Sequence, residues 1–101
     1  MAEGVRVEDD GSTACVRVRG EVDIALTPAI DAAVEGLRGR DVVIDLREVS
    51  FMSSSGLASL LRAKRQADAE GSRLALRAPS RQVREVLDMT RLTTVFTIVE
   101  D

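Results

Sequence analysis

The stretch DVVIDL, residues 41–46, constrains the fold more than any other part of this chain. Four of its six residues are apolar, and the run is too short to form a helix on its own. Such a run is typical of a central strand that is buried on both faces, as in a parallel sheet covered by helices. Because parallel strands need crossover connections, we expect helices before and after this strand.

An opening β-hairpin is expected before this strand. Apolar and polar residues alternate over residues 5–8 and again over residues 14–19, and Asp10-Gly11 between them supplies turn residues. The following stretch GEVDIAL, residues 20–26, is expected to be a connection. The hairpin therefore adds an antiparallel pair to an otherwise parallel sheet.

Three helices are expected after the hairpin. Thr27 before Pro28 predicts a hydroxyl N-cap followed by proline at the first helical position, and this helix is expected to stop near Gly39. A second apolar pattern runs from Leu57 to about Ala69 and is closed by Gly71. Ser80 is expected to cap the third helix. Two strand patterns flank this helix, at residues 73–77 and 94–99.

The predicted fold class is α/β, with the order β-β-α-β-α-β-α-β and a mostly parallel sheet packed by helices. A length of 101 residues fits one domain over residues 1–101. No apolar run approaches the roughly 20 residues of a membrane span, and the first ten residues lack a secretion pattern. We therefore expect a soluble, cytoplasmic protein that does not bind membranes.

Composition excludes several classes of function. The chain has no histidine and one cysteine, which removes zinc sites and Ser-His-Asp hydrolases. The two glycine-rich phosphate-binding motifs, G-x-x-x-x-G-K-[ST] and G-x-G-x-x-G, do not occur. A net charge of −3 with two phenylalanines as the aromatics argues against nucleic acid. We expect no enzyme activity, no metal and no cofactor, and we interpret Cys15 as a small strand residue without a role.

Three serines and a glycine, Ser53 to Gly56, stand between the central strand and the second helix. One interpretation is a helix N-cap, for which a single serine is enough. The other is a phosphorylation switch, because a phosphate carries about −1.5 to −2 charge and is tolerated at a helix N-terminus. The spacing alone leaves both interpretations open.

Three ordered motifs resemble the STAS-domain anti-sigma factor antagonists of bacterial partner-switching systems. They are VRGEVDIALTPAIDAAV, VVIDLREVSFMSSSGLASLL and VREVLDMTRLTTVFTIVED, and together they cover almost the whole chain. The resemblance implies a STAS-like open sheet flanked by helices. It also implies a phosphoacceptor at Ser54, with Ser53 as the alternative acceptor.

The resemblance implies a function in transcription regulation, of the sporulation or stress type. In such systems the unphosphorylated antagonist binds an anti-sigma factor with a GHKL-type serine kinase domain and so releases a sigma factor. The kinase phosphorylates the antagonist with ATP, and a PP2C-type phosphatase resets it. In this chain Ser53 replaces the family's aspartate. The alternative function is a non-switching STAS adaptor in a larger assembly, such as a stressosome-like particle or a lipid-transport ABC complex.

Family position also implies a partner-binding surface around the serines. Asp23 has a second interpretation, as a loop residue making a turn hydrogen bond. The implied partner-binding residues are Glu21, Asp23, Ser53, Ser55 and Gly56.

Two further residues have open interpretations. Asp45 either orients the serine loop or lies at the end of its strand and meets water. Met89, which follows the third helix, is expected in the core.

Overall fold

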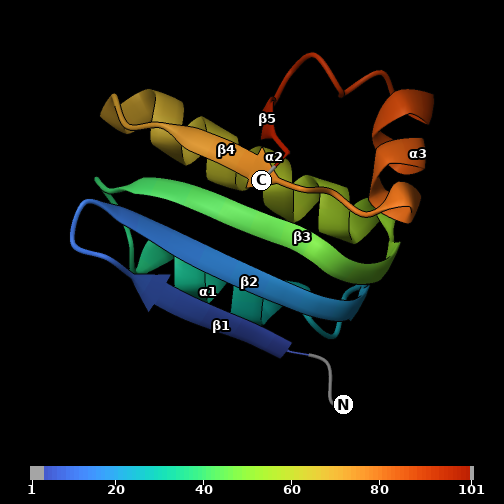
Figure 1. The fold of residues 1–101 in the computed structure, drawn as a ribbon, viewed down its shortest axis with the longest axis horizontal. Helices are drawn as coiled ribbons and strands as arrows, with labels where there is room; N and C mark the ends of the chain where they lie inside the picture. The colour runs from blue at the N-terminus through green and yellow to red at the C-terminus, as the bar shows by residue number, and fades with distance from the viewer. Residues whose placement is uncertain (1–3, 101) are drawn as a thin grey trace.

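The computed structural model describes residues 4–100, which form one five-stranded sheet with the strand order β1-β2-β3-β4-β5 (Figure 1). β1 (Gly4–Asp9) and β2 (Thr13–Val22) pair antiparallel as the expected hairpin. Asp10 closes the turn, because its carboxylate accepts hydrogen bonds from the backbone of Ser12 and Thr13. This edge of the sheet is as the sequence predicts.

The remaining strands are all parallel to β2. β3 (Asp41–Met52) lies in the centre and pairs with β2 on one side and with β4 (Leu74–Arg77) on the other. β5 (Thr97–Val99) is a three-residue edge strand beside β4. The predicted fold class, an α/β domain with a mostly parallel sheet, is confirmed.

Two helices cover one face of the sheet, and a third lies at its end. α1 (Thr27–Glu35) and α2 (Ser54–Glu70) lie behind the strands, and α3 (Arg81–Met89) stands beyond β4 against β3 (Figure 1). Gly71 ends α2 in the left-handed conformation, and Ser80 accepts a hydrogen bond from Val83 N, as predicted. No helix in residues 4–100 is long and apolar enough to cross a membrane.

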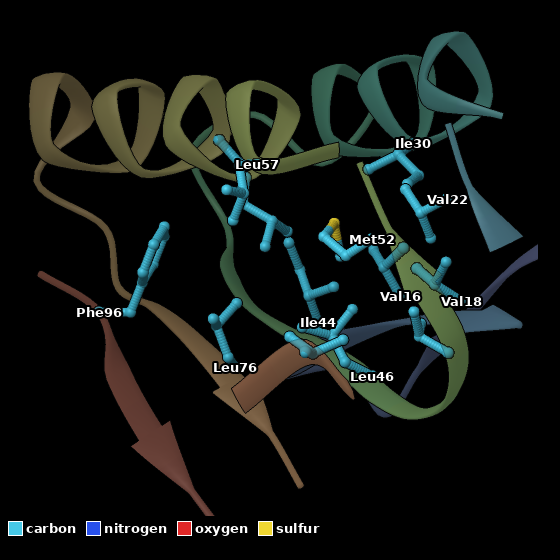
Figure 2. Close-up of a cluster of buried hydrophobic side chains, with 14 of the residues drawn as sticks. Val16, Val18, Val22, Ile30, Ile44, Leu46, Met52, Leu57, Leu76 and Phe96 are labelled. Carbon is cyan, nitrogen blue, oxygen red and sulfur yellow. The ribbon is translucent and has the colours of Figure 1, made fainter. Parts of the chain in front are cut away.

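The hydrophobic core fills the space between the sheet and the helices. Figure 2 shows Ile30 and Leu57, from the two covering helices, facing the strand residues Ile44 and Leu76. Every second residue points into this layer along the first halves of β2 and β3, from Ala14 to Val18 and from Val42 to Leu46, which is the period of a half-buried strand. The largest core side chains with less than 2% exposure are Ile30, Ile44, Leu46, Leu60, Leu76, Leu87, Val16, Val18, Val22, Val49 and Val83.

The opposite face of the sheet carries charged side chains. The run 41–46 is largely buried on both faces, as predicted, since Asp45 is buried and Val43 is half-buried on this second face. Arg17 pairs with Glu8 at 3.0 Å, and Arg19 pairs with Glu48 at 2.8 Å. Asp45 belongs to this face, in register with Arg17 of β2 and Arg77 of β4. Ion pairs between neighbouring strands therefore line this face.

Asp45 itself lies elsewhere than either interpretation placed it. It is 4% exposed in the middle of β3, and its carboxylate accepts a hydrogen bond from Arg47 N at 3.0 Å. β3 continues to Met52, so position 45 is neither a strand end nor near the serine loop. Met89 was also wrongly placed in the core: it is 83% exposed at the end of α3.

The connection expected over residues 20–26 begins later than predicted. β2 extends to Val22, and its register against β3 shifts at two places, one between Arg17 and Arg19 and one between Gly20 and Glu21. Each shift breaks the apolar alternation that marks a strand. Gly20 adopts a φ of +94°, which a residue with a Cβ rarely takes.

The first helix also starts differently. Its N-cap residue is Leu26, without a side-chain cap, and Thr27 is the buried first residue of α1. The carbonyl of Asp23 accepts hydrogen bonds from the N–H groups of Leu26 and Thr27, so a backbone turn winds the chain before Thr27 could cap it. The predicted Thr27 N-cap is therefore wrong. The helix ends at Glu35, a few residues before Gly39.

An ion pair that links the hairpin to the loop before β3 gives a pH-dependent prediction. Arg40 donates two hydrogen bonds of 2.8 Å to Asp9, which hold the pKa of that carboxyl well below its usual range, with help from Gly11 N. A depressed native pKa contributes stability above the unfolded pKa of about 4, and this contribution is lost as the pH falls. Asp9→Asn should thus lower stability at neutral pH and flatten its acid dependence.

Urea unfolding between neutral and acidic pH measures this effect. Asp68→Asn, in the exposed pair between Lys64 and Asp68 on α2, is the control for removing one carboxylate from a surface pair. An unfolding free energy that falls equally steeply with acid in the wild type and in Asp9→Asn would contradict the prediction.

Candidate functional site

The serine run forms the junction between β3 and α2. Ser53 is the N-cap of α2, with extended backbone (φ −85°, ψ 175°), and its hydroxyl accepts a hydrogen bond from Gly56 N at 3.3 Å. The Ser53 hydroxyl also lies 2.7 Å from that of Ser55, and the two share a hydrogen bond. The capping interpretation of the serines is therefore correct, and Ser53 alone fills that role.

Ser54 is the first residue of α2 and is exposed, whereas Ser53 and Ser55 are half-buried. The N-terminus of a helix carries a partial positive charge and N–H groups without helical partners. A 17-residue helix begins here with no acidic side chain in its first turn. The hydroxyl at position 54 thus lies where a negative group would be stabilised by the helix.

Gly56 is buried beneath this turn, so it is not part of the surface that a partner could touch. A Cβ at this position would lie 2.3 Å from the Met52 sulfur, 2.9 Å from Val22 Cγ1 and 3.3 Å from Val22 O. The contacts with Met52 and with Val22 Cγ1 are shorter than real Cβ contacts, and the one with Val22 O is tighter than most. The glycine lets the first turn of α2 pack directly on the ends of β2 and β3.

The loop after β2 lies beside the serine run, as the topology predicts. Ser53 N donates a 2.9 Å hydrogen bond to Val22 O, and Glu21 is opposite Phe51 in the β2-β3 register. Glu21 is exposed. Asp23 accepts a 2.9 Å hydrogen bond from Ala25 N, so its interpretation as a turn residue is correct. Both segments form one end of the sheet.

Two exposed apolar side chains at this end were missed by the sequence reasoning. Ile24 is 78% exposed in the loop after β2, and Phe51 is 50% exposed near the end of β3. We call Glu21, Ile24, Phe51 and Ser54 the serine-loop surface.

The serine-loop surface offers one exposed hydroxyl, that of Ser54. Among residues 4–100, no cluster of three or more histidine, cysteine or acidic side chains could hold a metal ion. Lys64, the one lysine of the chain, lies further along α2 and pairs with Asp68 at 2.8 Å. The surface thus combines an accessible hydroxyl with acidic and apolar neighbours.

Comparison with known proteins places this geometry in a family. The family model described as "Mlab, STAS domain" matches residues 5–100. An anti-sigma factor antagonist from Mycobacterium paratuberculosis is 26% identical, with a TM-score of 0.87, and the match covers 99% of this chain and 87% of that one.

Two structures of SpoIIAA show the same fold at 24% identity. The anti-sigma factor antagonist SpoIIAA in its unphosphorylated form has a TM-score of 0.81, with 97% of this chain and 90% of that one covered. The phosphorylated form of this Bacillus cell fate determinant has a TM-score of 0.76, with 97% and 93% covered. The family model spans nearly all of the described residues, and the chain therefore belongs to the STAS domain family.

Proposed function

We propose that this protein is an anti-sigma factor antagonist switched by phosphorylation of Ser54. The unmodified form binds an anti-sigma factor with a GHKL-type serine kinase domain and releases a sigma factor. Phosphorylation ends that complex, and a PP2C-type phosphatase restores the binding form. The whole chain, residues 1–101, acts as one STAS domain in the cytoplasm.

The observation that carries the proposal is the exposure of Ser54 at the first position of α2. A kinase needs an accessible hydroxyl, and the helix N-terminus accommodates the charge of the product. Ser53, the alternative acceptor, is half-buried and bonded to Gly56 N and Ser55. Ser54 is thus the better acceptor.

The neighbouring side chains support a partner surface at the same place. Ile24 and Phe51 expose apolar area, and buried apolar area supplies most of the free energy of association. The other residues implied in partner binding, Glu21, Asp23, Ser53 and Ser55, come from the same two adjoining segments, and Gly56 packs beneath them on Val22 and Met52. SpoIIAA, which shares this fold, exists in an unphosphorylated and a phosphorylated form. A phosphate at position 54 would add negative charge to this surface.

Phosphate transfer tests the proposal directly. We expect incubation with ATP and the cognate anti-sigma factor kinase to add the mass of one phosphate, mapped to Ser54 by peptide sequencing. Ser54→Ala should abolish the transfer, whereas Ser53→Ala, which loses a cap of about 1 kcal/mol, should still accept it. If Ser54→Ala still accepted phosphate and Ser53→Ala did not, the acceptor would be Ser53.

The second candidate is a non-switching STAS adaptor in a larger complex. One observation favours it: Ser53 occupies the position of the family's aspartate, so a kinase that recognises that carboxylate would not find it. The same incubation separates the two functions. An unmodified chain that still binds its partner stably in the presence of ATP would support the adaptor.

A further inference from the structure

β1 is an edge strand of the sheet. Within residues 4–100 no element lies beyond it (Figure 1), and it pairs with β2 over all six residues without an irregularity. Proteins usually protect such edges with proline, with bulges, with charged side chains or by covering them. The charges of β1 are of both signs, so they oppose only those partner strands whose charges do not match. β1, GVRVED, contains no proline and is longer than the other edge strand, β5. Its outer backbone groups are available to another strand.

The hairpin turn determines which residues of β1 point their backbone groups outward. Asp10 N donates to Thr13 O at 3.2 Å, so these two residues form a hydrogen-bonded pair. Hydrogen-bonded and non-bonded pairs alternate along an antiparallel ladder. The pairs that follow therefore alternate in the same way, and the N–H and C=O groups of Val5, Val7 and Asp9 point away from β2.

These three residues are arranged symmetrically around Val7. A second β1 strand running antiparallel, with Val7 opposite its own copy, places Val5 opposite Asp9 at both ends. All three outward-pointing residues then have partners, which gives about six backbone hydrogen bonds across the two strands. A C2 interface pairs the same surface from both copies in this way.

The charges of β1 select this register among the alternatives. With Val7 on the two-fold axis, Arg6 is opposite Glu8 of the other copy, and the opposite charges attract on both sides. A shift by two residues in one direction would bring Arg6 against its own copy, and in the other direction Glu8 against its own copy. Arg6 is exposed. Glu8 pairs with Arg17 within the chain but keeps nearly half of its side chain exposed, so both side chains can reach the other copy.

We propose that two copies of this protein associate through their β1 strands, with Val7 at the two-fold axis, to form one continuous ten-stranded sheet. Val7 is 45% exposed on the helix side of the sheet, and pairing with its copy would cover it. The axis is perpendicular to the sheet, which keeps α1 of both copies on the same face. The serine-loop surface is formed by β2, β3 and α2, so this inference does not depend on the proposed function.

Sedimentation equilibrium from micromolar to millimolar concentration tests the proposal, and we expect a reversible dimer. Val7→Pro removes an N–H that points outward and spares the β1-β2 ladder, so it should weaken association by about tenfold or more. Arg6→Glu places two acidic residues opposite each other and should also weaken it. Adding Glu8→Arg to Arg6→Glu restores opposite charges and should restore the dimer.

Arg81→Glu on α3 makes the same change in charge at a residue with an 87% exposed side chain outside the sheet, and it should leave association unchanged. Circular dichroism checks that each variant is folded. A wild type that stays monomeric at millimolar concentration would overturn the proposal. So would a dimer that withstands both Val7→Pro and Arg6→Glu, because the two copies would then meet at another surface.

Discussion

Phosphorylation of Ser54 is expected to lower the affinity for the anti-sigma factor by roughly 5- to 1000-fold. A phosphate carries nearly two negative charges, and at about 8 Å from one acidic group of the partner the repulsion is about 1 to 4 kcal/mol for effective dielectric constants of about 80 to 20. Ser54 is exposed at the first residue of α2, so the phosphate needs no rearrangement of the fold to reach the partner.

Two variants separate charge from the loss of the hydroxyl. Ser54→Asp carries one charge and should weaken binding by about 2- to 30-fold on the same estimate, whereas Ser54→Ala should bind as the wild type does. Titration calorimetry with the anti-sigma factor measures both. Because surface repulsion is screened by salt, the difference should shrink at high ionic strength. Equal affinities of the two variants would contradict the switch.

Gly56→Ala is expected to destabilise the fold by about 1 to 3 kcal/mol, although alanine is the better helix former. The added Cβ would overlap the Met52 sulfur and Val22 Cγ1, and both of these side chains are fully or almost fully buried. Neither can move without disturbing the core. Thermal and urea unfolding followed by circular dichroism measure the loss.

Gly36→Ala at the end of α1 is the matched control. A Cβ there meets its nearest atoms at 3.5 and 3.6 Å, which are ordinary contacts, and the backbone φ of −67° suits alanine. This variant should be neutral or slightly more stable. If the two alanine variants changed stability alike, the close packing beneath the serine run would not be the cause.

The predictions from sequence were correct where one physical pattern acted alone. Alternation of apolar and polar residues predicted the hairpin, and helical periodicity predicted α2 and α3. The preference of serine for N-caps predicted the cap at Ser80 and a cap within the serine run, which the structure places at Ser53. They failed where tertiary contacts changed the pattern. The two register shifts in β2 hid its last residues, and the carbonyl of Asp23 started α1 without Thr27 as the cap.

The candidate site was predicted in part. The accessibility of Ser54 and its proximity to the loop after β2 followed from the topology. The burial of Gly56 did not, because sequence gives no sign of what approaches a glycine in space. Met89 and Asp45 were misplaced for the same reason: an apolar residue at a helix end and a carboxylate within a strand acquire their surroundings from other elements.

The hydrogen bond from Ser53 N to Val22 O and the close packing of Gly56 on Val22 affect how the protein binds a partner. Loops that order only on binding lose conformational entropy at that moment, which weakens affinity. Here two segments far apart in sequence are already held in a single arrangement before any encounter. Recognition should therefore resemble rigid docking, with little change in heat capacity beyond that due to the area covered.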